Sequence, residues 1–471
     1  MNANGADQWS SRLGFVLAAI GAAVGLGNVW RFPAVVGQNG GGAYLVPYLI
    51  AAATFAVPLL AFEIGTGRSL RADVVTAFRS IRPEFAAFGW LVTAVVIVVL
   101  SYYLVITGWV LAFLVDALIG GGLTFAGFTG TLQPVVAFIA AAVTVGAIVS
   151  LGVREGIERL TSVLVPLAFV ILLVMALWTT QLDGFREGLT FFLTPDVSVL
   201  SDPLTWSAAF GQVFFSFSVG MGVMLTYGSY LDAEASVGRS AVFIAAADLA
   251  VALLAGIVIF ALVFTFGLTP TVGSELAFAT LPAAFAEMPL GWLFGLLFFG
   301  LLFFAAVAPS VSMLEVGVAA VVRKTDLRRR QASIVATAGI ILLGLPSALS
   351  YSSVGLSVAG VPVLDLLDGS VGAFGLPVAA LLISVGFTWY RSSNDLRETF
   401  GAAPVVPLVK YVIPPVLGVV TAYRFISDPL VTTWRRLPDG AAMPAGFVAA
   451  TLFALTLFAL GGWWLHRQSS G

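Results

Sequence analysis

Two stretches of the chain place polar groups inside segments that are otherwise apolar. The first, residues 21–33, reads GAAVGLGNVWRFP, and the second, residues 211–222, reads GQVFFSFSVGMG. Lipid offers no partner for a free backbone N–H or carbonyl group, so a broken helix is tolerated at membrane depth only where it is buried in protein or lines a polar cavity. Unwound carbonyls can bind a cation, and the free N–H groups of a helix N-terminus can bind an anion. Together these groups suit a zwitterion such as an amino acid.

A single carboxylate, Asp248, lies in the apolar run IAAADLAV at residues 244–251. A buried carboxylate is costly unless it is paired with a cation or protonated. Asn28, Ser216 and Asp248 supply oxygen ligands of the kind that hard cations prefer. The alternative for residues 21–33 is a glycine-rich packing face whose arginine, Arg31, reaches the membrane surface. We favour a functional site, because an ionisable residue at membrane depth needs a specific partner.

The elements that must position these groups are membrane-spanning helices. The chain has 471 residues, of which 59% are hydrophobic and 10% are charged, whereas soluble proteins have about a quarter charged residues. It has no cysteine and one histidine, His466. This composition excludes disulfides, thiol nucleophiles and cysteine-bound metals, argues against histidine catalysis and predicts that the protein is not an enzyme. The net charge of −2 gives no indication of a nucleic-acid partner.

Apolar runs of about 20 residues predict about twelve spanning helices in one bundle. They are expected at 12–36, 42–66, 88–119, 131–151, 162–181, 206–230, 240–268, 290–322, 331–350, 363–390, 404–426 and 444–465. Arginine and lysine gather in alternate loops, and the positive-inside rule therefore places both termini in the cytoplasm. The outer loop at 269–289 is expected to contain a short helical lid.

Gly25-x-Gly27 and Gly220-x-Gly222 occupy matching positions five helices apart. Matching interrupted helices in two halves indicate a transporter with inverted repeats and a binding site near the midplane. With 50 glycines in the chain, a chance match is the alternative. The predicted fold is an all-α membrane protein with two inverted five-helix repeats, in which helices 1 and 6 are broken. A single domain covers 1–471, with a first repeat region at 12–231 that includes the start of the second repeat, a second repeat at 206–391 and two accessory helices at 404–466.

The first stretch, extended from Trp9 to Ala43, resembles helix 1 of the neurotransmitter:sodium symporter family. Residues 212–230 resemble helix 6 of this family, and Tyr102-Tyr103 and residues 365–368 resemble parts of its helices 3 and 10. The short loops are similar to those of the prokaryotic, LeuT-like branch, whose members carry amino acids. The resemblance implies a sodium-coupled symporter of amino acids in the cell membrane that works by alternating access.

The resemblance also implies a binding site. The substrate carboxylate would meet the backbone of Gly25 to Gly27 and the Tyr103 hydroxyl. The substrate ammonium would meet carbonyls near Ala23, Phe215 and Ser216. The pocket for the substrate side chain would be lined by Val99, Ile106, Ser218, Met221 and Met313. A first sodium ion would bind the Ala23 carbonyl, Asn28, Ser216, Asp248 and the substrate carboxylate. Ion and substrate would then each complete the site of the other, which is the physical basis of coupling.

Gates and a chloride site follow from the same resemblance. Arg31 and Asp368 would close the outer side above Tyr103 and Phe215, although Asp368 could instead be a carboxylate at a helix N-terminus. Trp9, Ser229 and Tyr230 would belong to the inner gate. The alternative for Tyr103 is an interfacial or core tyrosine, and the adjacent Tyr102 could be just that. Chloride in this family binds near Tyr48, Gln212 and Ser216, but Ala252 replaces the serine that completes the site. Since Asp248 already supplies a negative charge, we expect no chloride requirement.

The span at 290–322 departs from the family at two positions. Ala308 and Pro309 stand where a threonine and a serine usually bind a second sodium ion, together with carbonyls matching Gly21, Val24 and Ala305. Alanine has no side-chain ligand, and proline has neither a hydroxyl nor an N–H group. The second site is therefore expected to be weak or lost. Coupling could run through one sodium ion or through a proton on Asp248, and we favour sodium because the other ligands of the first site are present.

The inner gate also departs from the family. Asp7 and Arg323 could form an inner pair of reversed charge, although we favour Arg323 as a membrane anchor beside Lys324. Met221 and Met313 indicate a flexible apolar pocket wall, which suits a hydrophobic or aromatic amino acid. Two alternatives within the same fold stay open. One is a proton-coupled or uncoupled amino-acid carrier, and the other is a substrate-sensing receptor. The expected partners are the amino-acid substrate and the lipid bilayer.

Overall fold

The computed structural model describes residues 8–195, 197–232, 234–268, 276–358, 360–400 and 405–427. The predicted span at 444–465 and Asp7 lie outside these residues. Every predicted span up to residue 426 is helical within the described part of the chain. Eight of these spans are long and apolar enough to cross a membrane without a break, and a bent pair of helices makes a ninth. The prediction of an all-α membrane protein is therefore confirmed.

The chain folds into helices that follow the predicted order, with π-helical and 3-10 segments written η. The first half contains α1 (Arg12–Ala23), η1 (Gly27–Arg31), α2 (Phe32–Gln38), η2 (Gly42–Tyr44), α3 (Leu45–Ala51), η3 (Ala52–Ala56), α4 (Val57–Leu70), α5 (Val74–Ile81), η4 (Pro83–Phe85), α6 (Ala86–Ile119), α7 (Phe125–Thr129), α8 (Gln133–Ser150), η5 (Val153–Glu158), α9 (Arg159–Thr179), α10 (Phe185–Leu193) and η6 (Val197–Ser201).

The second half continues in the same way and contains a short antiparallel hairpin. Its elements are α11 (Pro203–Ser216), α12 (Val223–Ser229), α13 (Val237–Phe266), η7 (Leu276–Thr280), α14 (Leu281–Ala286), α15 (Gly291–Lys324), α16 (Arg329–Ser350), β1 (Ser357–Val358), β2 (Val361–Pro362), α17 (Val363–Leu367), η8 (Asp368–Gly375), α18 (Leu376–Trp389), α19 (Ser393–Phe400), α20 (Val405–Pro407), η9 (Leu408–Val412) and α21 (Ile413–Ser427). The outer loop expected to hold a short helix has helical structure at 276–286.

Two helices are interrupted where the glycine pattern predicted it. The chain bends by 51° between α1 and the η1–α2 segment. Residues 217–222 separate α11 from α12, and within them Ser218, Gly220 and Gly222 have positive φ angles of 50°, 79° and 69°. These conformations cannot continue a right-handed helix. The breaks therefore expose backbone groups in the interior of the bundle.

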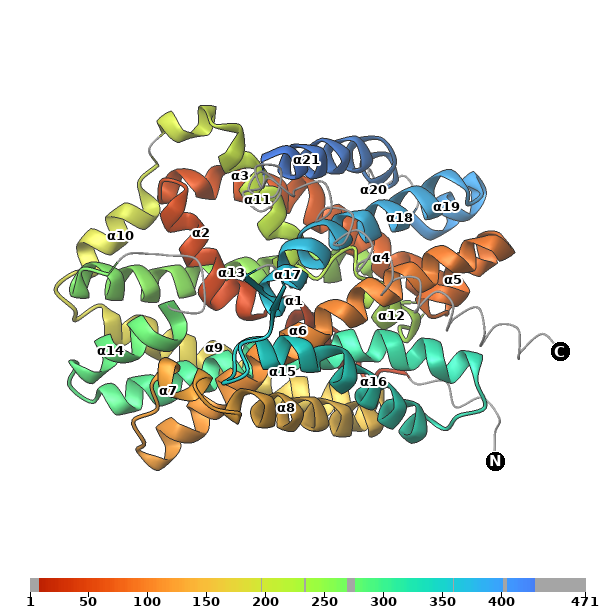
Figure 1. The fold of residues 1–471 in the computed structure, drawn as a ribbon. Coiled ribbons are helices and arrows are strands. Elements are labelled where there is room, and N and C mark those ends of the chain that lie inside the picture. The colour runs from red at the N-terminus through yellow and green to blue at the C-terminus, as the bar shows by residue number, and fades with distance from the viewer. Residues whose placement is uncertain are drawn as a thin grey trace, which may run out of the picture.

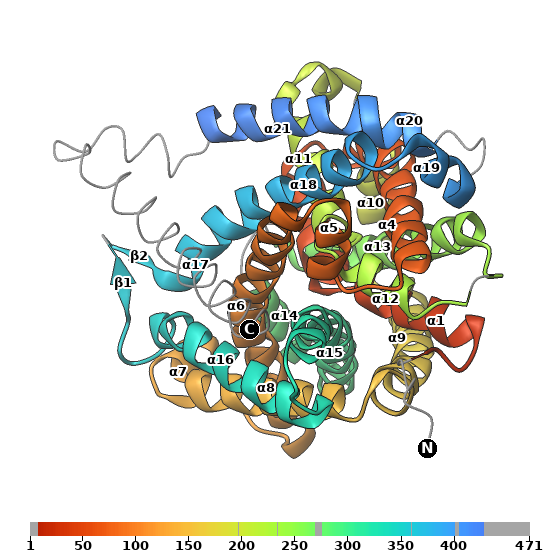
Figure 2. The ribbon, with the colours of Figure 1, turned by 90° about the vertical axis from the view of Figure 1, so that its right-hand side faces the viewer.

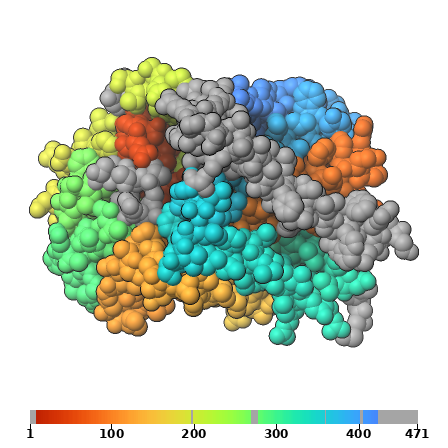
Figure 3. All heavy atoms as spheres, in the orientation of Figure 1, coloured from red at the N-terminus to blue at the C-terminus, as the bar shows by residue number. Residues whose placement is uncertain are grey.

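The helices around the breaks form two packed groups. In one group, α6, α8, α15 and α16 contact one another, and α8 and α16 lie together at the lower edge of both ribbon views (Figures 1 and 2). In the other, α4 packs against α12 and α13. The first helix, α1, contacts α9, α12, α13 and α15, so it lies between the groups. Only a small red patch of N-terminal residues is visible in the space-filling view (Figure 3).

Candidate substrate and ion site

The two breaks are tied together by side chains. The Ser218 hydroxyl donates to the Ala22 carbonyl at 2.6 Å. The Gly220 N–H group donates to Oε1 of Glu63, on α4, at 2.6 Å. Ser218, which was predicted to line the pocket for the substrate side chain, has a positive φ and its hydroxyl is directed to the first break. Glu63 fixes the second break, and its role was not predicted from the sequence.

A buried polar cluster lies beside the first break. Nδ2 of Asn28 donates to Oδ1 of Asp248 at 2.8 Å, and Oδ1 of Asn28 accepts from the Gly25 N–H group at 3.1 Å. Nε2 of Gln212 donates to the Gly27 carbonyl and to the Ser216 hydroxyl, both at 3.0 Å. The structure thus brings together Asn28, Ser216 and Asp248, as the sequence predicted, and each is fully buried.

Three oxygens of this region have no hydrogen-bond partner among the described residues. They are Oδ2 of Asp248, Oε1 of Gln212 and the phenol oxygen of Tyr48. A buried polar atom without a partner is costly, and a buried anion is costlier still. Carboxylate, amide and hydroxyl oxygens are the ligands that a hard cation prefers. The donor set therefore fits a sodium ion, to which Asp248 would supply the neutralising charge.

A cavity of about 150 Å³ opens above the first break. It is lined by Leu26, Gly27, Trp30, Arg31, Tyr102, Tyr103, Ile106, Trp109, Phe215, Tyr351, Leu364, Asp365 and Asp368. Four of the predicted substrate residues, Gly27, Tyr103, Ile106 and Phe215, are on its wall. Val99, Met221 and Met313 are buried, with 2%, 4% and 4% of their surfaces exposed.

The roof of this cavity is formed by Gly27, the Phe215 ring and the Arg31 guanidinium group, which lie one upon another. The Phe215 ring lies so close to Gly27 that a Cβ atom there would be 2.6 Å from Cδ1 of Phe215. The Arg31 guanidinium carbon lies 4.5 Å from the centroid of the same ring, which is a cation–π geometry. A glycine is therefore required at position 27 for Phe215, and with it Arg31, to cover the site.

The predicted outer-gate residues face the same cavity without pairing directly. Arg31 stacks on Phe215, whereas Oδ1 of Asp368 accepts from the Tyr102 hydroxyl at 3.1 Å. No ion pair joins Arg31 to Asp368 within the described residues. Tyr102, which could be an interfacial or core tyrosine by its sequence position, is buried and lies on the wall of this cavity. Its hydroxyl is a hydrogen-bond donor to the Asp368 carboxylate on the same wall.

The inner side is closed by aromatic and ionic contacts. Nε1 of Trp9 donates to the Tyr227 carbonyl at 3.0 Å. The Tyr230 hydroxyl donates to Oε1 of Glu315 at 2.6 Å, and Glu315 forms an ion pair with Arg329 at 2.5 Å. Trp9, Ser229 and Tyr230, the predicted inner-gate residues, are each 8% exposed. The structure is thus closed toward the cytoplasmic side expected from the sequence.

Arg323 contacts the segment between α4 and α5. Its Nη2 donates to the Arg71 carbonyl at 2.8 Å, and its Nε lies 3.7 Å from Oδ2 of Asp73. Asp73 is the N-cap of α5, where its carboxylate also accepts from two backbone N–H groups. Asp7, the predicted partner, is outside the described residues. Arg323 therefore connects the end of α15 to the turn between α4 and α5.

Several carboxylates with clear structural roles were missed from the sequence. Glu63 and Glu315 lie inside apolar runs, which is the same signal that identified Asp248. Oε2 of Glu158 accepts from the Ser10 N–H group at 2.8 Å, and Oε1 accepts from the Ser10 hydroxyl. Glu158 thus holds the start of α1 against η5. Its position at the edge of a span gave no comparable signal.

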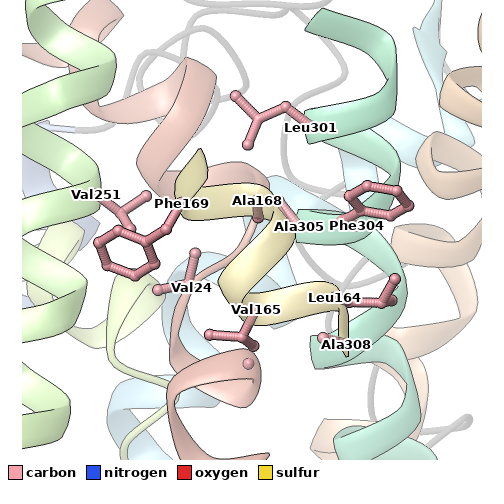
Figure 4. Close-up of a pocket in the computed structure, with 11 residues that line it drawn as sticks. Val24, Leu164, Val165, Ala168, Phe169, Val251, Leu301, Phe304, Ala305 and Ala308 are labelled. Atoms are coloured by element: carbon pink, nitrogen blue, oxygen red, sulfur yellow. The ribbon is translucent and has the colours of Figure 1, made fainter. Parts of the chain in front are cut away.

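The expected position of the second cation is apolar. A cavity of about 20 Å³ there is lined by Gly21, Val24, Leu164, Val165, Ala168, Phe169, Val251, Leu301, Phe304, Ala305 and Ala308. Figure 4 shows these apolar side chains from three neighbouring helices gathered around the break of the first helix. The Ser310 hydroxyl donates to the Ala306 carbonyl of its own helix at 2.8 Å, and Ser310 is not among the residues that line this cavity.

Comparison with known proteins identifies the family. The profile of the sodium:neurotransmitter symporter family matches residues 6–126 and 124–433. The chain belongs to this family. It is therefore a multi-pass membrane transporter and not an enzyme.

Relatives and a solved structure agree with this assignment. YhdH, an uncharacterized sodium-dependent transporter of Bacillus subtilis, is 37% identical over 83% of this chain and 89% of its own length. Human sodium- and chloride-dependent GABA transporter 2 is 25% identical over 86% of this chain and 76% of its own length. The crystal structure of MhsT in complex with L-phenylalanine superposes with a TM-score of 0.81 at 36% identity, covering 89% of this chain and 99% of that chain.

Proposed function

We propose that this member of the sodium:neurotransmitter symporter family carries a hydrophobic or aromatic amino acid with one sodium ion, bound at the first site. The observation that carries the proposal is the buried cluster of Asn28, Ser216 and Asp248 beside the first break, in which Oδ2 of Asp248 has no hydrogen-bond partner among the described residues. A bound sodium ion would neutralise this carboxylate and offer a ligand position to the substrate carboxylate. The ion and the amino acid would then stabilise each other in the site.

Different residues around the cavity would bind different parts of the substrate. Tyr103 and the backbone around Gly27 would orient the substrate carboxylate, and Phe215 and Ile106 would contact its apolar side chain. Arg31 and Asp368 would close the roof. Trp109 adds an aromatic ring to the same wall. The apolar and aromatic lining supports a hydrophobic substrate, and the structurally similar MhsT was crystallised with L-phenylalanine.

Loss of the second sodium site is part of the proposal. Ala308 leaves the cavity near Gly21 and Val24 with apolar side chains only. Carbonyl groups alone give a hard cation fewer than its usual six or so oxygen ligands. Apolar cavities of this kind stay dry, so water would not complete the coordination shell. We therefore expect one sodium ion per amino acid.

The experiment is transport by the purified protein in proteoliposomes. Hydrophobic amino acids should accumulate when an inward sodium gradient is applied, with one sodium ion entering per amino acid. Asp248→Asn should abolish sodium-driven accumulation. Asp116→Asn is the matched control, because the Asp116 carboxylate accepts the Leu123 N–H group of a loop, and this change should leave transport intact. Two sodium ions per substrate would contradict the single-site proposal.

Two further outcomes separate the alternatives. Accumulation driven by a pH gradient without sodium would favour a proton on Asp248, and binding without accumulation would favour a substrate-sensing receptor.

Ala252, one turn after Asp248, has no hydroxyl for an anion, so replacing chloride by gluconate should leave uptake unchanged. A marked loss of uptake in gluconate would contradict chloride independence.

A further inference from the structure

Pro309 changes the hydrogen bonding of α15 next to the substrate site. It lies in the middle of this 34-residue helix and is buried. A proline has no N–H group, and its ring crowds the carbonyl one turn earlier. The carbonyl of Ala305 therefore loses its normal helical donor. Since Ala305 is only 2% exposed, water does not readily replace that donor, and the carbonyl needs another partner.

The partner in the structure is Tyr103, from α6. Its hydroxyl donates to the Ala305 carbonyl at 3.4 Å and accepts from the Leu26 N–H group at 3.4 Å. A Cβ atom at Gly25 would lie 3.3 Å from the Tyr103 hydroxyl, 3.3 Å from Cγ of Pro309 and 3.7 Å from the Ala305 oxygen. The tyrosine, the proline and the freed carbonyl thus meet at the break of the first helix.

Both hydrogen bonds of the Tyr103 hydroxyl are long. Hydrogen bonds between a hydroxyl and an oxygen acceptor are usually about 2.7–2.8 Å long, and longer contacts are weaker. A phenol has a single proton, so Tyr103 donates to one acceptor at a time. A carboxylate is a stronger acceptor than a neutral carbonyl. The hydroxyl is therefore held weakly by Ala305 and would turn to a carboxylate that comes within reach.

We propose that the Ala305 carbonyl, freed by Pro309, is a competing acceptor that holds the Tyr103 hydroxyl until the substrate carboxylate displaces it. The proposal rests on the proposed function in one respect, which is that the substrate carries a carboxylate that reaches Tyr103. Competition lowers substrate affinity. Substrate binding would also break the hydrogen bond that joins Tyr103 on α6 to Ala305 on α15, beside Gly25. Pro309 thereby becomes a positioning residue that links the substrate site to the position where the second sodium site is lost.

The first test uses the protein without substrate. Tyr103→Phe removes the hydroxyl and should destabilise the protein with Pro309, because the Ala305 carbonyl loses its donor. Pro309→Ala restores an N–H group to that carbonyl, so Tyr103→Phe should have little further effect in the Pro309→Ala background. Thermal unfolding of the four proteins in this double-mutant cycle measures the coupling. Additive effects would show that the two residues do not share the carbonyl and would overturn the proposal.

The second test measures amino-acid affinity at saturating sodium. A neutral hydrogen bond is worth about two- to tenfold in an equilibrium constant, so Pro309→Ala should tighten binding by that factor. The gain should vanish in the Tyr103→Phe background. Pro346→Ala, which removes a proline inside α16, is the matched control and should leave affinity unchanged. Equal affinities of Pro309→Ala and the unmodified protein would overturn the proposal.

The two tests separate this proposal from the proposed function. The double-mutant cycle without substrate tests only the hydrogen bond from Tyr103 to Ala305. Failure of the unmodified protein to bind any amino acid would contradict the proposed function and, with it, the competition between carbonyl and substrate. Pro309→Ser adds a hydroxyl to the restored N–H group. If Pro309→Ser and Pro309→Ala behave alike at every sodium concentration, the effect comes from the carbonyl. A sodium-dependent difference between them would assign it to a rebuilt cation site and overturn the proposal.

Discussion

The hydrogen bond from Tyr230 to Glu315 offers a direct test of how the inner side is closed. Tyr230 follows α12, the inner part of the second broken helix, and Glu315 belongs to α15. Tyr230→Phe removes the 2.6 Å bond but leaves Glu315 paired with Arg329. A hydrogen bond to a charged group contributes about 1.5–3 kcal/mol. If the bond exists only when the inner side is closed, its loss should raise the population of the inward-open state roughly 10- to 100-fold.

The absence of cysteine from the sequence makes the measurement clean. Ser229→Cys places a single thiol next to Tyr230, at a position that is 8% exposed in the closed structure. When opening is fast compared with the chemistry, the rate of labelling by a maleimide follows the open population. Tyr230→Phe should therefore accelerate labelling by at least tenfold. Tyr390→Phe is the matched control, because Tyr390 is 51% exposed. Labelling of the Tyr230→Phe protein within about twofold of the Ser229→Cys parent would refute the reasoning.

Three further variants test other contacts. Gly27→Ala would place a Cβ atom 2.6 Å from the Phe215 ring, so amino-acid affinity should fall by about tenfold or more, and unchanged affinity would contradict the described roof. Tyr102→Phe removes the donor to Asp368 and should speed dissociation of a bound, radiolabelled amino acid toward the outer side, whereas an unchanged off-rate would show that this bond does not hold the gate. Glu158→Gln weakens the charged hydrogen bonds that hold the start of α1 and, introduced into the Ser229→Cys parent, should raise its labelling rate about fivefold. A labelling rate equal to that of the parent would argue that Glu158 does not help to close the inner side.

The sequence was most informative where the membrane restricts what a chain can do. Spans follow from the length of apolar runs, because each backbone group must be paired inside lipid. The breaks at Gly25 and Gly220 were visible because glycine and polar residues are rare at that depth. Asp248 stood out for the same reason. The same argument, applied consistently, would also have found Glu63 and Glu315.

Partners across the bundle could not be predicted in the same way. Several acidic residues fall in loops on the same predicted side of the bundle as Arg323. Only the fold shows that Asp73 is the one that lies beside it. Tyr102 and Tyr103 are neighbours on one helix, and about 100° of rotation between them sends one hydroxyl to Asp368 and the other to the first break. The role of Ser218 depends on its left-handed backbone conformation, which residue type alone does not indicate.

The methyl group of Ala308 also has a consequence for bioenergetics. A carrier that takes one sodium ion with a zwitterion moves one net charge, which gains about 2.3 kcal/mol at 100 mV. A tenfold sodium gradient adds about 1.4 kcal/mol. The total of about 3.7 kcal/mol limits accumulation of the amino acid to roughly 500-fold, whereas a second ion would square that limit to about 2 × 10⁵-fold. With apolar side chains in place of two hydroxyls, the carrier would reach a smaller maximal amino-acid gradient. In return, half as much sodium would enter the cell for each amino acid taken up.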